Sequence, residues 1–96
     1  MQLNNKFDPE DKYHIAQMKD TFMFRNHLCI VLELLSHNLY ELIRQNQHKG
    51  FHHSLIRAIL AQLLEGMVLL NEAKIVHCDL KPENILLRKY LLFLIK

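Results

Sequence analysis

The first half of the chain carries two short hydrophobic runs whose spacing predicts a pair of strands. Apolar and polar residues alternate over residues 16–24, which is typical of a strand with one buried face. Residues 28–34 are apolar apart from Glu33 and rich in branched side chains, which favours a strand buried on both faces. The polar residues 25–27 between the runs predict a turn, so we expect a hairpin.

The middle of the chain changes to helical spacing. Residues 39–45 repeat leucine and isoleucine three and four positions apart, and the polar residues 36–38 before them can each cap a helix start. A longer helix is predicted after Ser54, from Leu55 onward, because one apolar stripe recurs at positions i, i+3, i+4 and i+7. The stripe consists of Leu55, Ile56, Ile59, Leu60, Leu63, Leu64, Met67 and Leu70. Residues 1–14 are polar and are expected to form a loop with no helix or strand.

A polar loop follows over residues 77–87, with the sequence His-Cys-Asp-Leu-Lys-Pro-Glu-Asn-Ile-Leu-Leu. Short apolar runs at residues 75–76 and 85–87 are expected to be strands on either side of it. The pattern His-x-Asp-Leu-x-x-x-Asn within this loop is typical of the catalytic loop of a protein kinase. The alternative is a polar loop whose Asp and Asn serve turn geometry alone.

Three side chains in the loop predict its chemistry. Phosphoryl transfer depends mainly on positioned groups and balanced charge. Asp79 is expected to accept the proton of the substrate hydroxyl, and Lys81 to neutralise charge on the transferring phosphate. Asn84 is expected to offer its carbonyl oxygen to Mg²⁺, a cation that prefers oxygen ligands.

Two further stretches of the sequence indicate which group of protein kinases the chain resembles. Residues 24–31, Phe-Arg-Asn-His-Leu-Cys-Ile-Val, and residues 38–43, Asn-Leu-Tyr-Glu-Leu-Ile, together with the loop resemble the dual-specificity tyrosine-regulated kinases, the DYRK family with its Yak branch. Most protein kinases have Arg between the His and Asp of the loop, where it clamps a phosphate on the activation loop. This chain has Cys78 there, which cannot make that contact. The resemblance runs over residues 7–87.

The resemblance implies an α+β fold, the central fragment of a protein-kinase domain. Residues 7–35 would hold two strands of the small lobe and the hinge. Residues 36–87 would hold two helices and the catalytic loop of the large lobe. Residues 88–96 are apolar where the family continues toward Asp-Phe-Gly, so we expect a divergent tail. Residues 1–96 are therefore expected to be one partial kinase domain.

The resemblance also implies a site for ATP with Mg²⁺. Leu32 would be the gatekeeper behind the nucleotide, at a position where the family usually has Phe. The backbones of Glu33 and Leu35 would bond the adenine edge, and Leu86 would form the floor under the ring. Asn38 would lie near the ribose, with capping of the following helix as the open alternative.

Complete members of the family phosphorylate Ser and Thr hydroxyls of proteins and autophosphorylate on Tyr, so the resemblance implies a protein substrate. The Gly-rich loop, the strand Lys paired with a helix Glu, and Asp-Phe-Gly are absent from this sequence, whose only glycines are Gly50 and Gly66. We therefore expect the chain alone to be inactive. The alternative function is a non-catalytic, kinase-derived interaction module that binds a chaperone or a second copy through an exposed apolar helix.

Charge and hydropathy argue against two classes of partner, nucleic acids and membranes. A net charge of +2, spread along the chain, gives no basic patch for nucleic acid, and no uninterrupted apolar run approaches a membrane span. We expect neither partner, and an intracellular location in the cytoplasm or nucleus. Cys29 and Cys78 suit free thiols of a reducing compartment. His48, His52 and His53 lack structural-zinc spacing, so a solvated turn is expected there instead of a metal site.

The long apolar stripe also predicts the stability of the isolated chain. In a kinase domain this helix packs against helices that follow the catalytic loop. Burying a leucine contributes roughly 1.5 to 3 kcal/mol, whereas a whole domain is stable by only about 5 to 15 kcal/mol. An unburied stripe removes much of that margin, so we expect a marginally stable or self-associating chain.

Overall fold

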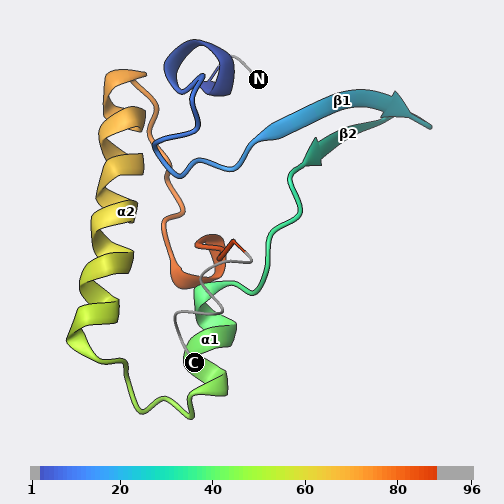
Figure 1. Cartoon of the computed structure of the whole chain (residues 1–96). Helices are drawn as coiled ribbons and strands as arrows, with labels where there is room; N and C mark the ends of the chain where they lie inside the picture. Colours follow the sequence, from blue (N-terminus) through green and yellow to red (C-terminus); the bar gives the residue numbers. More distant parts are fainter. Residues whose placement is uncertain (1–2, 89–96) are drawn as a thin grey trace. The chain divides into compact units, whose positions relative to one another are not determined.

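The computed structural model describes residues 3–88 of the 96-residue chain. Its two compact units comprise residues 3–34 with 61–76, and residues 35–60 with 77–88. Helix α2 (His53–Glu72) contributes residues to both units (Figure 1). One two-stranded antiparallel sheet together with helices confirms the α+β class.

Strands β1 (Met18–Phe24) and β2 (His27–Leu32) form the predicted hairpin (Figure 1). The connecting residues Arg25 and Asn26 both have positive φ, 47° and 64°. Positive φ at both central residues is the geometry of a type I′ turn, whose twist matches that of the flanking strands. The turn is therefore two residues long, and His27 already belongs to β2.

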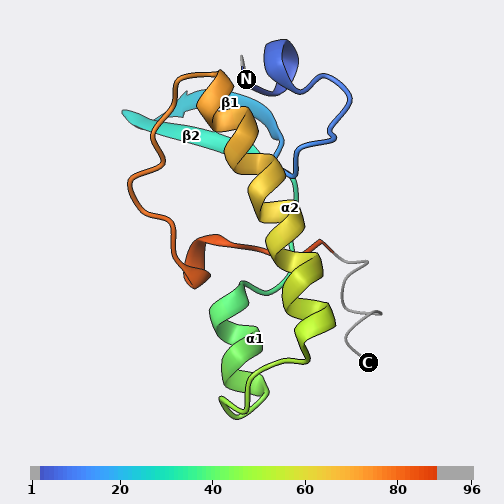
Figure 2. The ribbon, with the colours of Figure 1, turned by 90° about the vertical axis from the view of Figure 1, so that its left-hand side faces the viewer.

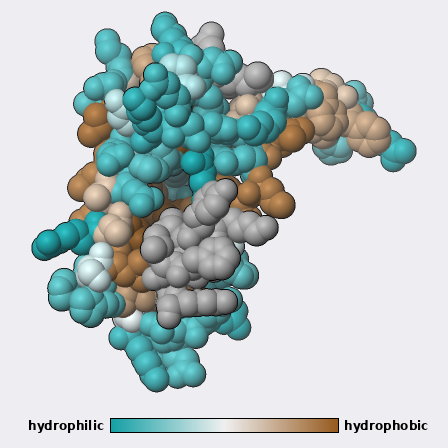
Figure 3. Space-filling view, viewed as in Figure 1, coloured by the Kyte–Doolittle hydropathy of each residue, from teal (hydrophilic) through white to brown (hydrophobic). Residues whose placement is uncertain are grey.

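The burial predicted for the hairpin is wrong. We expected one buried face for the first strand and two for the second, but Phe22, Met23, Leu28 and Ile30 are 47–66% exposed. The apolar side chains of the hairpin lie on the surface in Figure 3. Backbone pairing and the turn thus form the hairpin without a core beneath it.

The segment before β1 is more ordered than the predicted loop. Residues Leu3–Phe7 form a π-helical turn, although no helix was expected over residues 1–14. After it, Asp8 is 4% exposed and accepts hydrogen bonds from the amides of Lys12 (2.7 Å) and Tyr13 (3.2 Å). A buried carboxylate that accepts two backbone N–H groups fixes the path of such a segment.

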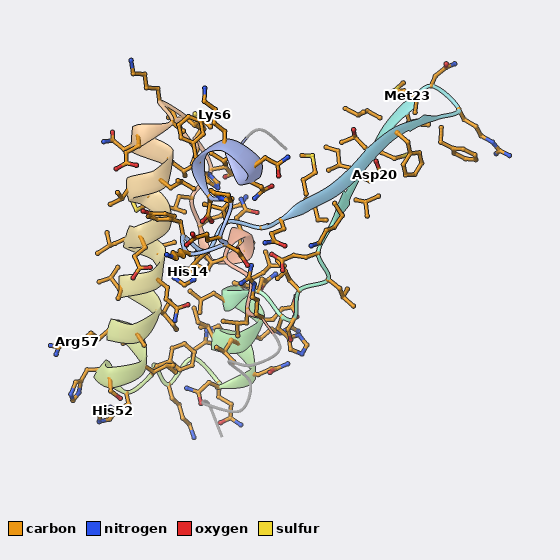
Figure 4. All side chains as sticks on the ribbon, turned by 45° about the horizontal axis from the view of Figure 1, so that its top comes forward. Lys6, His14, Asp20, Met23, His52 and Arg57 are labelled. Carbon is orange, nitrogen blue, oxygen red and sulfur yellow. The ribbon has the colours of Figure 1, made fainter. Side chains whose placement is uncertain are left out.

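The same segment packs on the C-terminal half of α2. Gly66 is buried there, and a Cβ at this position would lie 3.1 Å from the carbonyl oxygen of Tyr13. Glycine permits this close approach of backbone to helix. Next to it, Nε2 of His14 lies 2.9 Å from Oε2 of Glu65, and Figure 4 shows His14 beside α2.

Helix α1 (Leu39–Gln45) begins and ends with local capping bonds. Oδ1 of Asn38 accepts a hydrogen bond from the amide of Glu41 (2.8 Å), so Asn38 is the N-cap among the three predicted candidates. Gln47 follows the helix with a left-handed φ of 56°, and the next amide bonds back to the carbonyl of Ile43. This is the Schellman arrangement, which satisfies carbonyls at a helix end.

Helix α2 begins at His53, two residues before the start of the predicted apolar run at Leu55. Local hydrogen bonds cap both of its ends. His52 precedes it, and Nδ1 of that ring accepts a hydrogen bond from the amide of Ser54 (3.2 Å). At the other end Lys74 has a φ of 58°, and the amide of Ile75 bonds to the carbonyl of Leu70 (2.9 Å).

The buried residues of α2, the long helix in Figure 2, differ from the predicted stripe. Leu69, which the stripe omits, is only 1% exposed, and Gly66 is buried beside it. The difference arises because the N-terminal segment packs on α2 at Gly66. Four members of the stripe remain 43–49% exposed, namely Ile56, Leu60, Leu64 and Met67.

By length and composition, α2 is long and apolar enough to cross a membrane, and no second helix of residues 3–88 is. The expectation of no membrane partner rests on uninterrupted apolar runs, whereas the apolar residues of α2 are interrupted by polar ones such as Arg57 and Glu65. Core helices of globular proteins have similar compositions, so this property alone does not assign α2 to a bilayer.

Candidate active site in the loop at residues 77–87

Backbone pairing fixes the C-terminal end of the loop. Residues 85–87 run beside the segment that precedes α1, with an antiparallel bridge between Asn38 and Leu86. Three hydrogen bonds join Ser36 N to Leu87 O (2.7 Å), Leu87 N to His37 O (3.0 Å) and Leu39 N to Ile85 O (2.7 Å). The strand predicted at residues 85–87 is therefore present as a single bridge. The strand predicted at residues 75–76 is not part of any sheet in the described region.

A small apolar core anchors this pairing within the same unit. Leu42 of α1 and Leu87 are 5% and 2% exposed. The loop itself contains a 3-10 turn, Pro82–Asn84, which lies next to α1. Pro82 suits the start of this turn, because its ring fixes φ near the helical value.

Asp79 and Asn84 are held together by the turn. Nδ2 of Asn84 donates to the backbone carbonyl of Asp79 (2.8 Å) and to its carboxylate oxygen Oδ2 (3.1 Å). The amide of Asn84 also donates to the carbonyl of Lys81 (2.9 Å). The three predicted catalytic side chains thus lie in one turn, as the motif requires.

Lys81 lies between two carboxylates. Its Nζ is 3.4 Å from Oδ1 of Asp79 and 3.9 Å from Oε2 of Glu83. The side chains of Lys81 and Asp79 are 47% and 63% exposed. Exposed ion pairs of this kind contribute little to stability. Lys81 can therefore leave Asp79 for a phosphate group at little cost.

The chemistry of Asn84 fits a magnesium ligand. Both hydrogen bonds of its side chain use Nδ2, and Oδ1 takes part in none within residues 3–88. Mg²⁺ is usually held by one or two protein oxygens together with substrate phosphates and water. No three side chains of His, Cys, Asp or Glu gather into a metal site within the described region. Oδ1 of Asn84 and the carboxylates of Asp79 and Glu83 are side-chain oxygens within the loop.

The predicted adenine-binding residues fall into both units. Leu32 and Glu33 belong to the first unit, where the amide and the carboxylate of Glu33 both bond to the backbone of Gln17. Leu35 belongs to the second unit, and its amide forms no hydrogen bond with any residue of the described region. The free amide of Leu35 can donate a hydrogen bond to an adenine nitrogen.

In the second unit the structure brings together Asn38 and Leu86, the predicted ribose and adenine-floor residues. They are paired by the bridge described above, and Leu86 is 46% exposed. Oδ1 of Asn38 is engaged as the cap of α1, so the capping role is observed. Capping leaves the amide nitrogen Nδ2 available to a ribose hydroxyl.

Sequence reasoning missed one contact in the loop. Nδ1 of His77 accepts a hydrogen bond from the amide of Asp79 (3.1 Å), and Cys78 between them has a φ of 69°. The signal in the sequence is a ring nitrogen two residues before the amide that it binds. That spacing is also common by chance, so it could not have been singled out.

Residues 1–95 match the protein kinase domain family. With the loop geometry in place, this match shows that the chain belongs to the protein kinase family. The match includes residues 88–95, where a divergent tail is expected, and residues 89–95 of this tail lie outside the described residues.

Individual relatives show that the chain is similar to kinases of the DYRK/Yak group. The chain is 63% identical over 86 residues to serine/threonine-protein kinase ppk15 of Schizosaccharomyces pombe, covering 90% of this chain and 16% of that protein. It is 54% identical over 85 residues to dual specificity protein kinase YAK1 of Saccharomyces cerevisiae, covering 88% and 10%. The DYRK-family kinase pom1 of Schizosaccharomyces pombe is 51% identical over 87 residues, covering 91% and 8%. The chain therefore spans less than a fifth of the length of these relatives.

Proposed function

We propose that this chain carries the catalytic loop and hinge of an ATP-dependent protein kinase that transfers phosphate to Ser and Thr hydroxyls, with dual specificity through Tyr. The single observation that supports the proposal most is the joining of Asp79, Lys81 and Asn84 in one turn. In this proposal residues 7–35 supply small-lobe strands and the hinge, and residues 36–87 supply the first part of the large lobe.

The proposed roles follow from the atoms that the turn presents. The carboxylate of Asp79 takes the proton from the substrate hydroxyl while Asn84 holds the same carboxylate in place. Lys81 moves from Asp79 to the transferring phosphate, where its charge offsets the charge on oxygen. Bound at Oδ1 of Asn84, Mg²⁺ would supply charge neutralisation to the phosphates of ATP.

Nucleotide binding tests the proposal directly. We expect calorimetry with Mg²⁺ and ATP to detect saturable binding to the chain, and Asn84→Ala to weaken it about tenfold or more, equivalent to at least ~1.4 kcal/mol. The physical reason is the loss of a metal ligand together with the bonds that fix Asp79. Asp79→Asn serves as a second variant, because it keeps the shape of the carboxylate and removes its charge.

Asn71→Ala is the matched control for this measurement. Asn71 is an exposed asparagine of α2 whose side chain forms no hydrogen bond within residues 3–88. Its substitution should leave nucleotide affinity unchanged. Equal affinity of the unmodified chain, Asn84→Ala and Asn71→Ala, or no binding by any of them, would contradict the proposed nucleotide site.

A second candidate function is a non-catalytic interaction module. It is favoured by the exposed apolar side chains of α2 at Ile56, Leu60, Leu64 and Met67, which a globular domain would ordinarily bury. In this alternative the exposed side chains contact a chaperone or a second copy of the chain, and nucleotide binding is absent. The concentration dependence discussed below tests it.

A further inference from the structure

One stretch of the chain departs from the even spread of charge that was expected. Residues 42–64 contain no aspartate or glutamate, whereas they contain three of the 12 lysines and arginines, namely Arg44, Lys49 and Arg57. Subtracting these three from the 12 basic residues leaves nine against ten acidic ones, so this stretch accounts for the net positive charge. Three of the seven histidines lie in the same stretch and add positive charge when protonated.

The three cations of this stretch are exposed, and none of them forms an ion pair within residues 3–88. The acidic residues that flank the stretch have partners outside it, since Glu41 pairs with His37 and Glu65 pairs with His14. Cations without an acidic neighbour attract an anionic partner more strongly than cations that are already paired.

Arg57 belongs to an exposed face at the start of α2 that also carries apolar side chains. Positions 53, 56, 57 and 60 have the spacing i, i+3, i+4 and i+7, so they share one face of the helix. His53 and Arg57 are exposed on it, and Ile56 and Leu60 are each 49% exposed. These four residues make up the α2 face. Figure 4 shows the side chains of Arg57 and His52 at this end of α2, both pointing outward from the helix.

Local contacts hold the start of α2 in place. Nδ1 of His52 accepts a hydrogen bond from the amide of Ser54 (3.2 Å) and lies 2.8 Å from its Oγ. The ring of His53 lies against that of His52, with 4.2 Å between the ring centroids. The side chain of Asn46 donates to the carbonyl of Gly50, which ties the connection from α1 together. The α2 face therefore needs little ordering when a partner binds, which favours affinity.

The mixture of charged and apolar side chains indicates an acidic peptide as the partner. An apolar partner would bury the guanidinium of Arg57 without an anion, which is costly. Strong nucleic-acid binding uses roughly six to ten phosphate contacts, and membrane-binding basic clusters contain about four to eight lysines and arginines. The stretch has three such cations. A peptide with apolar residues between its carboxylates matches both kinds of side chain.

We propose that the α2 face is a docking surface for an acidic peptide segment of a partner protein. Carboxylates of the peptide pair with Arg57, and its apolar side chains cover Ile56 and Leu60. Arg44 and Lys49 belong to the same unit and add to the attraction that brings an acidic segment to this surface. The inference goes beyond the proposed function, because the α2 face contains none of the residues proposed to bind nucleotide.

A fluorescently labelled peptide tests the docking surface. The probe has the order Glu-Leu-Glu-Glu-Leu-Glu, and its control has glutamine in place of every glutamate. Fluorescence anisotropy, with a trace of peptide and increasing concentrations of the chain, measures both affinities. We expect saturable binding of the acidic peptide, about fivefold or more tighter than binding of its control. This preference should weaken as salt is added, because ions screen exposed charges beyond about 8 Å at 0.15 M.

Substitutions separate the charged part of the surface from its apolar part. Arg57→Gln should weaken binding of the acidic peptide about two- to fivefold, the range for one exposed ion pair, and should reduce the preference over the glutamine peptide. Leu60→Gln should weaken binding of both peptides by a similar factor, because it removes an apolar contact. Arg25→Gln is the matched control, since Arg25 is an exposed arginine in the hairpin turn of the other unit. Its substitution should leave both affinities unchanged.

Three results would overturn the inference. They are equal affinities of the unmodified chain for the two peptides, equal affinities of Arg57→Gln and Arg25→Gln for the acidic peptide, and no binding of either peptide. In the last case vesicles containing phosphatidylserine, duplex DNA and sedimentation of the chain alone show whether a membrane, a nucleic acid or a second copy covers the surface instead.

The test is also separate from that of the proposed nucleotide site. Asn84→Ala should leave the affinity for the acidic peptide unchanged, and Arg57→Gln should leave the affinity for Mg²⁺ and ATP unchanged. A chain that binds the peptide but not the nucleotide keeps the docking surface and contradicts the proposed function. A chain that binds the nucleotide but not the peptide does the reverse.

Discussion

Asp8 is the polar residue with the strongest local effect in the N-terminal segment. Its carboxylate is buried and accepts the amides of Lys12 and Tyr13, so its removal leaves two amides without their acceptor. We expect Asp8→Ala to lower the free energy of unfolding by about 1 to 3 kcal/mol, measured by urea denaturation. Glu10→Ala is the control, because Glu10 pairs with Lys12 only through exposed side chains. Its cost should stay within about 0.5 kcal/mol, and equal effects of both substitutions would contradict the role of Asp8.

The residues of the site divide by how far the sequence could predict them. Asp79, Lys81 and Asn84 stand at a fixed spacing within one short loop, so their spacing in the sequence alone predicts that they lie together. Asp8 and His77 act on backbone amides, and those bonds exist only when particular residues have left-handed φ. Residue type and spacing do not fix φ at non-glycine positions, which is why neither contact was predicted.

For the helices and strands, the sequence predicts where each element lies along the chain. It does not predict which of their side chains are buried. Both strands and both helices lie where hydrophobic spacing and capping residues indicated, because these signals act over a few neighbouring residues. Burial depends on what covers an element. Leu69 is buried three residues after Gly66, where the N-terminal segment packs on α2, while Leu60 of the same helix is half exposed. Such contacts join residues far apart in sequence, so periodicity alone does not reveal them.

Asn38, at the start of α1, has two predicted roles, which substitutions can separate. As the N-cap it accepts the amide of Glu41, and Asn38→Ala should cost about 1 kcal/mol of unfolding free energy. Asn38→Asp keeps the acceptor and should preserve stability in the same urea experiment. Asp lacks the amide nitrogen that a ribose hydroxyl could contact, so weaker ATP binding by a fully stable Asn38→Asp chain would support the ribose role. Unchanged stability of Asn38→Ala would contradict the cap.

At the scale of the whole chain, large apolar side chains are exposed in both units. In the described residues only Leu42, Leu69 and Leu87 are buried hydrophobic residues. Kinase relatives of far greater length match 88–91% of the chain, and these relatives have much more chain available to cover such surfaces. In the chain alone the exposed side chains favour association, because burying apolar surface is the main driving force for contact between proteins.

We therefore expect the isolated chain to self-associate, with an unfolding midpoint that rises with protein concentration. Leu60 and Leu64 of α2 are each 49% exposed, and replacing both by Gln should weaken association about tenfold or more in sedimentation measurements, since burial of half a leucine contributes roughly 1 kcal/mol. Ala61→Gln, an exposed position on the same helix, should leave association unchanged. A monomer whose cooperative melt is independent of concentration would refute this expectation, because three buried leucines would then suffice for a stable fold.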